Sequence, residues 1–171
     1  MHTLFTIGYE GTDISRFLKT LKNVGVTVLA DVRAVPVSRK KGFSKNSLRS
    51  SVESVGIEYL PLRQLGDPKA GRIAARAGRY GEFREIYEKH LEQPDAVEAI
   101  KVLEGVSIDR STCLLCFERA PETCHRSIIA DRITRKGFST LNLYADDPER
   151  YVRNPISVSS YSIGQSASAA E

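Results

Sequence analysis

The sequence predicts an α/β fold: a single three-layer domain, Rossmann-like, whose mostly parallel sheet carries helices on both faces. Two observations predict it. Short apolar runs alternate with segments in which apolar residues recur every three or four positions, as on one face of a helix. The run 26–32 is almost wholly apolar and β-branched, as expected of a strand covered on both sides. The 171 residues suffice for one such domain, which we place at residues 1–150.

Each expected strand is a short apolar run that ends at a glycine, a proline or a polar residue. The five expected strands are residues 3–7, 26–32, 57–60, 112–117 and 140–143. The expected helices are marked by apolar residues at helical spacing, by a capping residue or a proline at the start, or by a glycine at the end, which three of them have. The five expected helices are residues 13–24, 45–55, 83–91, 94–103 and 121–136, the first capped by Thr12 or Asp13.

Two segments lack such patterns. Residues 66–79 are rich in Gly, Arg and Ala without an apolar period, and we expect them to form a mobile loop. From Asn154 onward the chain is rich in Ser, Ala and Gly, so we expect residues 151–171 to be a disordered tail.

The composition excludes several classes of protein. No apolar run approaches the roughly 18 residues of a membrane span. The first eight residues lack the basic leader and long apolar segment of a signal peptide. Three cysteines in a chain of this size argue against a disulfide framework. We therefore expect a cytoplasmic protein that does not associate with membranes.

Basic residues are concentrated in one part of the chain. The net charge is +4, but residues 33–79 contain eleven Lys and Arg against three acids, and residues 32–52 contain no acid. Such a segment is either a solvated surface or a region that attracts the phosphates of a nucleotide or nucleic acid. Phe43 is the only aromatic residue of the acid-free run, so a stacking platform for single strands is poorly supported.

Residues 113–126, Cys-Leu-Leu-Cys-Phe-Glu-Arg-Ala-Pro-Glu-Thr-Cys-His-Arg, are the most informative for function. A strand here leads through a loop into a helix, and α/β proteins build anion-binding and catalytic sites at such junctions. Its reactive side chains are Cys116 and Glu118 in the loop and Cys124, His125 and Arg126 in the first turn of the helix.

Polar side chains follow the other expected strands as well. Because the carboxyl ends of parallel strands share one edge of a sheet, we expect these side chains to face one crevice. The residues at these strand ends are Gly8, Tyr9 and Glu10 after the first strand, Asp31, Arg33 and Ser38 after the second, Arg63 after the third, and Tyr144, Asp146 and Asp147 after the last.

The chemistry of these residues suggests roles. The acid and base candidates are Glu10, Asp31, Glu118 and His125. Cys124 is a candidate nucleophile, because a helix N-terminus and nearby cations favour a thiolate; the alternative is a buried packing role. The substrate-binding candidates are Gly8, Tyr9, Arg33, Ser38, Cys116 and Arg126. The two arginines suit a phosphate, and ion pairs with neighbouring carboxylates are the alternative.

A metal site is also conceivable, because Cys116, Cys124 and His125 offer three zinc ligands. The paired Cys-x-x-Cys segments of many zinc sites are missing, since Cys113 and Cys116 point to opposite faces of one strand. We therefore expect no metal and no other cofactor.

Three segments, taken together and in order, resemble the domain-of-unknown-function 488 family. They are residues 6–11 (Thr-Ile-Gly-Tyr-Glu-Gly), residues 31–33 with Pro36 and Ser38, and residues 116–118 with Pro121 and 124–126. The resemblance covers roughly residues 3–145. It implies an α/β domain of the bacterial and archaeal cytoplasm without an established activity. The chain departs from the family at Asp67, where members often have a second glycine.

We expect an enzyme that acts on a phosphate-containing substrate, a nucleotide or nucleic acid, by hydrolytic or glycosidic-bond chemistry. Two alternatives stay open. One is a non-catalytic nucleic-acid binding module that uses the basic segment 33–79. The other is a redox or sulfur-transfer protein that uses Cys116 and Cys124. The sequence leaves the oligomeric state undetermined.

Overall fold

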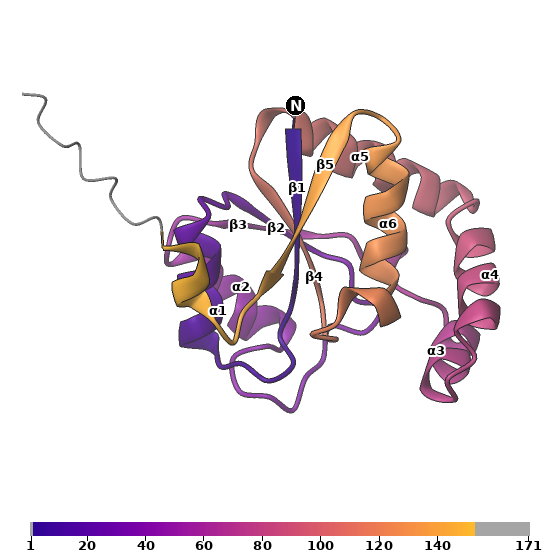
Figure 1. The fold of residues 1–171 in the computed structure, drawn as a ribbon, viewed down its shortest axis with the longest axis horizontal. Coiled ribbons are helices and arrows are strands. Elements are labelled where there is room, and N and C mark those ends of the chain that lie inside the picture. The colour runs from indigo at the N-terminus through magenta and orange to yellow at the C-terminus, as the bar shows by residue number, and fades with distance from the viewer. Residues whose placement is uncertain (1, 153–171) are drawn as a thin grey trace, which may run out of the picture.

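A computed structural model describes residues 2–152 and contains one sheet of five strands (Figure 1). The strands are β1 (His2–Gly8), β2 (Val28–Asp31), β3 (Glu58–Pro61), β4 (Thr112–Cys116) and β5 (Phe138–Tyr144). Their order is β3-β2-β4-β1-β5, and all four pairings are parallel. The predicted α/β fold is confirmed, and within residues 2–152 the sheet has no antiparallel edge strand.

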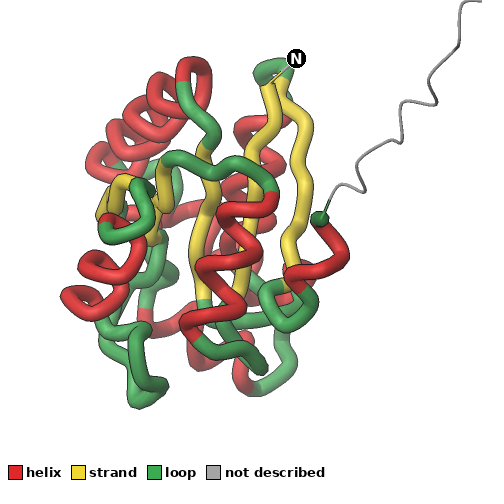
Figure 2. The backbone as a smooth tube through the Cα atoms, turned by 90° about the vertical axis from the view of Figure 1, so that its left-hand side faces the viewer, coloured by secondary structure: helices red, strands yellow, loops and turns green. Residues whose placement is uncertain are grey.

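Helices cover both faces of the sheet, which makes three layers (Figures 1 and 2). One face carries α1 (Ile14–Asn23) and α2 (Lys45–Glu53), and the other carries α4 (Tyr80–His90), α5 (Pro94–Asp109) and α6 (His125–Thr134). Successive residues of β4 serve the two cores in turn: Cys113 and Leu115 are buried against α1 and α2, whereas Leu114 is buried against the other layer. Cys113 is therefore a core residue, as predicted.

Local signals in the sequence account for several helix ends. Asp13 caps α1, because its Oδ1 accepts a hydrogen bond from the backbone N–H of Arg16 at 2.9 Å. Pro94 stands in the first turn of α5, where its missing N–H costs nothing. Gly25 and Gly137 follow α1 and α6 with φ of 75° and 92°, a conformation that favours glycine. These predictions are confirmed.

The predicted mobile loop at residues 66–79 is wrong, because most of this segment is helix α3 (Lys69–Arg76) packed against α4. Alanine and arginine are strong helix formers. The inward residues are small: Ala74 is fully buried, and a Cβ added to Gly71 would lie 3.4 Å from the ring of Phe83. A helix that packs through Gly and Ala shows no apolar period, so the sequence pattern concealed it.

The predicted helix 121–136 is also corrected. Pro121–Thr123 form a short 3-10 turn, and α6 begins only at His125. Between them Cys124 is extended, with φ of −119° and ψ of 142°, so it occupies the N-cap position and not the first turn. This break turns the Cys124 side chain toward the end of β4.

The last described residues form a turn, and the described helices are not of the membrane-spanning kind. Pro148–Tyr151 form a 3-10 turn, so Tyr151, where the predicted tail starts, is ordered; residues 153–171, which make up most of that prediction, lie outside the described residues. Among the helices of residues 2–152, none combines the length with the apolar composition of a bilayer-spanning segment.

The connections of β4 and its neighbours place the site. β1 and β2 lead into helices on one face of the sheet, whereas β4, which lies between them, leads into α6 on the other face. Chain segments that leave neighbouring parallel strands in opposite directions open a crevice at their carboxyl ends. In Figure 1 this edge is at the bottom of the sheet.

Gly8 allows the loop after β4 to pack against the end of β1, and this contact can be tested. A Cβ at residue 8 would lie 1.8 Å from the carbonyl oxygen of Glu118. We expect Gly8→Ala to lower the free energy of unfolding by more than about 2 kcal/mol, measured by urea denaturation. The control is Gly105→Ala in α5, where no atom lies within 4 Å; it should stabilise by about 0.4–1 kcal/mol. Equal effects of the two changes would contradict this account of Gly8.

Candidate functional site

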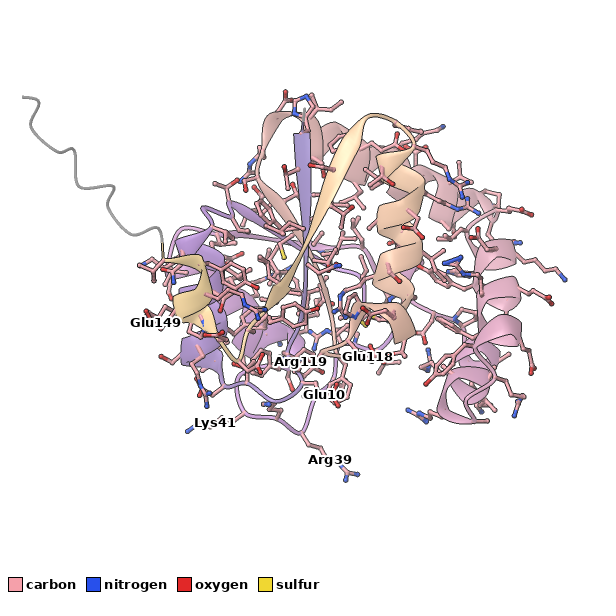
Figure 3. The ribbon with its side chains drawn as sticks, in the orientation of Figure 1. Glu10, Arg39, Lys41, Glu118, Arg119 and Glu149 are labelled. Carbon is pink, nitrogen blue, oxygen red and sulfur yellow. The ribbon has the colours of Figure 1, made fainter. Side chains whose placement is uncertain are left out.

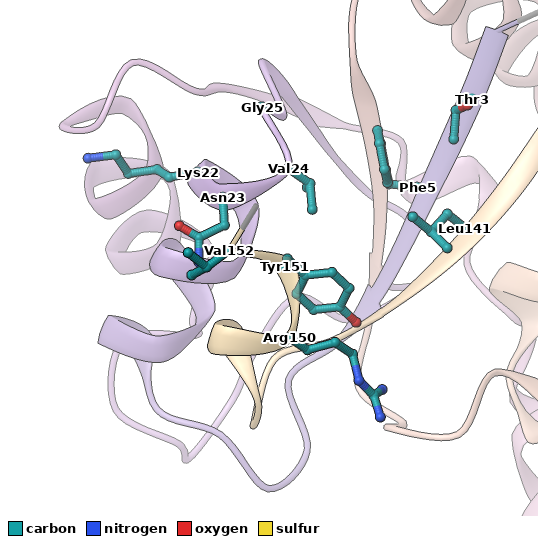
Figure 4. A pocket seen from close by; sticks show the side chains of 10 residues that line it. All are labelled: Thr3, Phe5, Lys22, Asn23, Val24, Gly25, Leu141, Arg150, Tyr151 and Val152. Atoms are coloured by element: carbon teal, nitrogen blue, oxygen red, sulfur yellow. The ribbon is translucent and has the colours of Figure 1, made fainter. Parts of the chain in front are cut away.

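A pocket of about 440 Å³ opens at the carboxyl ends of β1, β2 and β4. Pockets of this size hold small ligands. The residues that line it come from the loops after these strands, from the segment before α3, from α3 and from the start of α6: Tyr9, Arg33, Ala34, Val35, Val37, Asp67, Arg72, Ala75, Arg76, Cys116, Phe117, Glu118 and His125. A larger hollow of about 680 Å³ lies beside β1, β5 and the end of α1 (Figure 4). Among residues 2–152, those that line this hollow carry no thiol, carboxylate or imidazole, so we place the site at the first pocket.

Two thiols and an imidazole meet at the floor of this pocket. The Cys116 Sγ lies 3.6 Å from Nδ1 of His125, and the Cys124 Sγ lies 4.0 Å from the same nitrogen. The other ring nitrogen, Nε2, lies 2.8 Å from the carbonyl oxygen of Val32, to which it donates. None of the three side chains is more than 4% exposed. The break before α6 therefore brings together the Cys and His residues that the sequence singled out.

Burial and mutual contacts shift the ionisation of this cluster. Burial favours the neutral Cys124 thiol, but the Cys116 hydrogen bond and the charges of His125 and Arg126 hold its pKa well below the ordinary value. Burial, together with Cys124, raises the pKa of the Cys116 thiol. Burial lowers the pKa of His125, yet the neighbouring Cys124 outweighs this and raises it to about 9. The cluster alone thus favours a thiolate on Cys124 beside a protonated imidazole.

Two carboxylates border the floor. The Cys116 thiol donates to Oε2 of Glu118 at 3.1 Å, and burial followed by the charge of Cys124 raises the pKa of Glu118 to about 7. Oδ1 of Asp67 lies 3.9 Å from Nδ1 of His125. Figure 3 shows Glu118 at the lower end of the sheet. Acid and base groups therefore surround the thiols on the side that faces the pocket.

Asp31 and Arg33 form a buried ion pair beside the pocket. Nε and Nη2 of Arg33 donate to the two carboxylate oxygens of Asp31 at 2.8 and 2.6 Å, and the Tyr59 hydroxyl donates to the same carboxylate at 2.5 Å. Burial disfavours the charged guanidinium, but the pair raises the pKa of Arg33 above its usual value. Nη1 of Arg33 donates to the Phe43 carbonyl at 2.7 Å. The predicted alternative for Arg33, an ion pair with Asp31, is the arrangement observed.

Arg126 is fully buried and fastens the loop that follows β4. Its Nε donates to Oγ1 of Thr6 at 3.2 Å and its Nη2 to the Arg119 carbonyl at 3.0 Å, while Nη1 donates to the Glu118 carbonyl. It forms no ion pair with any carboxylate of residues 2–152. The guanidinium therefore shapes the site from behind and does not line the pocket.

Tyr9, Glu10 and Ser38 organise the surrounding loops. The Tyr9 ring lines the pocket and stacks on Phe43, with 4.5 Å between the ring centroids. Glu10 is exposed and accepts a hydrogen bond from the backbone N–H of Arg119 at 2.9 Å. Ser38 Oγ accepts one from the backbone N–H two residues later at 3.1 Å. Of the predicted residues, those that line the pocket are Tyr9, Arg33, Cys116, Glu118 and His125; those that lie around it are Gly8, Glu10, Asp31, Ser38, Cys124 and Arg126.

The sequence analysis missed the residues that α3 contributes. Arg72 and Arg76, one helical turn apart, line the pocket together with Ala75. Arg72 lies 3.6 Å from Oδ1 of Asp67, and Arg76 is exposed. Because this segment was predicted to be a loop, Arg72 and Arg76 were not expected to lie on the same face of a helix. Their i, i+4 spacing within an alanine-rich segment is the signal that could have identified them.

The Asp31–Arg33 pair generates a prediction that separates a structural from a catalytic carboxylate. Asp31→Ala leaves a buried guanidinium unpaired, so we expect the free energy of unfolding to fall by about 3–5 kcal/mol. The control is Glu58→Ala, which breaks a pair with Arg110 whose side chains are 54% and 39% exposed; it should cost less than about 1 kcal/mol. Urea denaturation measures both. Similar losses in the two variants would show that the buried pair does not hold the loop.

Comparison with known proteins agrees with the resemblance seen in the sequence. The model of the family described as "Domain of unknown function DUF488" matches residues 13–133, more than half of the 171 residues. No curated protein and no solved structure gives a significant match. The matched range runs from the N-cap of α1 into α6 and includes the ion pair, α3 and the Cys–His cluster. The chain therefore belongs to the DUF488 family.

Proposed function

We propose that this protein is an enzyme that acts on a phosphate-bearing substrate, a nucleotide either free or within a nucleic acid. One observation carries the proposal: a single pocket contains both basic and reactive groups. Arg72 and Arg76 stand on its α3 side, and Cys116, Glu118 and His125 on its floor. Convergent polar groups in a pocket at a topological switch point are the usual mark of a ligand site in α/β proteins.

Arg76 is the best-placed group for a phosphate. It is exposed and forms no ion pair with another side chain of residues 2–152. Arg72, on the preceding turn, is partly held by Asp67 but borders the same space. Guanidinium groups recognise phosphates through charge-assisted hydrogen bonds. These arginines take the role that the sequence analysis assigned to Arg33 and Arg126.

Apolar side chains in the pocket lining suit the flat apolar surface of a base. Val35, Val37 and Phe117 line the pocket and are 54%, 75% and 45% exposed, although large apolar side chains are usually buried. Nucleobases pack well on aromatic and aliphatic side chains. In the proposed complex the base lies on these side chains and the phosphate lies near the arginines of α3, within the same pocket as Glu118 and His125.

Nucleotide binding tests the proposal. Thermal stabilisation by nucleoside monophosphates should be seen in the native protein, and Arg76→Ala should weaken their affinity about 10–100-fold, the effect of losing a charge-assisted hydrogen bond. The control is Arg84→Ala on α4, which removes an exposed arginine 3.5 Å from Asp131 and outside the pocket. Turnover of a bound nucleotide should then fall in Glu118→Gln without loss of affinity. Stabilisation that Arg76→Ala leaves intact would refute the pocket assignment.

A second function, nucleic-acid binding without catalysis, is favoured by the loop between β2 and α2. Arg39 and Lys41 are exposed and project from it beyond the carboxyl edge of the sheet (Figure 3). For this function, the affinity for an oligonucleotide should fall steeply with salt concentration, and the double variant Arg39→Ala, Lys41→Ala should reduce the salt slope by about 2. Fluorescence anisotropy measures the slope. Binding that does not depend on salt would exclude this function.

A further inference from the structure

We propose that Cys116, Cys124 and His125 bind a zinc ion and leave its fourth coordination position open to the pocket. The donor atoms of these three side chains all lie within 4.8 Å of one another. Two thiolates and an imidazole are ligands that zinc prefers over the oxygen donors chosen by magnesium and calcium. The proposal goes beyond the function above, since metal binding can be measured with no substrate present.

Two donor distances are close to those of tetrahedral coordination. With Zn–S of about 2.3 Å and Zn–N of about 2.0–2.1 Å, a sulfur and a nitrogen ligand at the tetrahedral angle stand about 3.6 Å apart. The Nδ1 of His125 lies 3.6 Å from the Cys116 sulfur and 4.0 Å from the Cys124 sulfur. The Cys116 sulfur also lies 4.0 Å from Nε2, beside the ring and not in line with the Nδ1 lone pair, so metal binding requires both cysteine side chains to rotate. Cys113 cannot join, because it points to the opposite face of β4.

A hydrogen bond of the second ring nitrogen fixes the imidazole. Nε2 donates to the Val32 carbonyl, and in the neutral ring this leaves Nδ1 with a free lone pair on the side of the ring nearer the two sulfurs. Metal-binding histidines in proteins are commonly oriented by such a hydrogen bond from the second ring nitrogen.

The open position would face the pocket. Cys116 and His125 line the pocket whereas Cys124 lies behind them, so an ion held by all three has its free side toward the ligand space. Glu118 borders that side, with Oε2 3.1 Å from the Cys116 sulfur. Three protein ligands with one open position are the pattern of catalytic zinc sites, in which the ion activates water. This role in turnover rests on the proposed function; the binding of zinc does not.

Cobalt titration tests the site, since Co²⁺ substitutes for zinc and reports its ligands by absorption. The reduced native protein should bind one Co²⁺ per chain, with thiolate-to-cobalt charge transfer in the near ultraviolet and the intense visible bands of tetrahedral Co²⁺. Zinc should displace it. Cys124→Ser and His125→Gln should each weaken zinc affinity at least about 100-fold, because loss of a ligand exceeds the usual effect of losing an outer partner. The matched control, Cys113→Ala, removes a thiol of the same strand and should retain the spectrum.

A second measurement uses the native protein alone. In the native protein, zinc should protect Cys116 and Cys124, but not Cys113, from alkylation under mildly denaturing conditions, as read by peptide mass spectrometry. Two outcomes would overturn the proposal: native protein without the charge-transfer absorption, or zinc that leaves all three thiols equally reactive. A disulfide between Cys116 and Cys124 that forms readily in the presence of zinc would also overturn it and favour a redox pair. Retained zinc binding together with failed nucleotide binding would refute the proposed function alone.

Discussion

The arrangement of the site depends on how the loop after β4 is held against the end of β1. Arg126, fully buried, donates to the carbonyl oxygens of Glu118 and Arg119 and to Thr6 on β1. Gly8 permits the same loop to touch the β1 backbone. A buried guanidinium that binds backbone carbonyls cannot shift without leaving polar groups unpaired, which is costly. These contacts of Arg126 and Gly8 therefore fix Cys116 at the floor of the pocket and Glu118 beside it.

The loop after β2, which also lines the pocket, is likewise held by a buried guanidinium. The Asp31–Arg33 pair, with Tyr59 on the carboxylate and the Phe43 carbonyl on the guanidinium, pins the loop after β2. Gly66 approaches this loop so closely that a Cβ there would lie 2.2 Å from the Cα of Ala34. This close contact is made although Asp67 replaces the second glycine often found in the family. Asp67 instead places its carboxylate near His125 and Arg72.

Much of the fold follows from the sequence, and less of the site does. The mostly parallel sheet follows from the alternation of strands and helices, whereas the strand order does not, and the position of the pocket follows from the rule that parallel strands share a carboxyl edge. The roles of individual residues do not follow so directly. Arg33 and Arg126 have the side chains of phosphate ligands, but whether a guanidinium is buried depends on tertiary contacts made by Asp31, Thr6 and the loop carbonyls.

The proximity of Cys116 and Cys124 also depends on tertiary structure. Cys116, Cys124 and His125 are residue types that bind zinc, but their spacing along the chain matches no paired Cys-x-x-Cys motif. They meet because the chain breaks between the 3-10 turn and α6, and extended backbone at Cys124 turns its side chain back toward β4. A β-strand end and a helix N-cap thus converge on one histidine, whose Nδ1 lies 3.6 Å and 4.0 Å from the two sulfurs.

The floor and the α3 side of the pocket belong to different parts of the fold. The floor is built on β4 and α6, where buried hydrogen bonds from His125 and Arg126 to backbone carbonyls resist change. The arginines stand on α3, which packs chiefly on α4 through small residues and lies beside the sheet (Figure 1). Exposed side chains on such a helix can be exchanged at little cost in stability. In the enzyme that we propose, substrate binding on α3 and reaction at the floor are therefore separable by mutation.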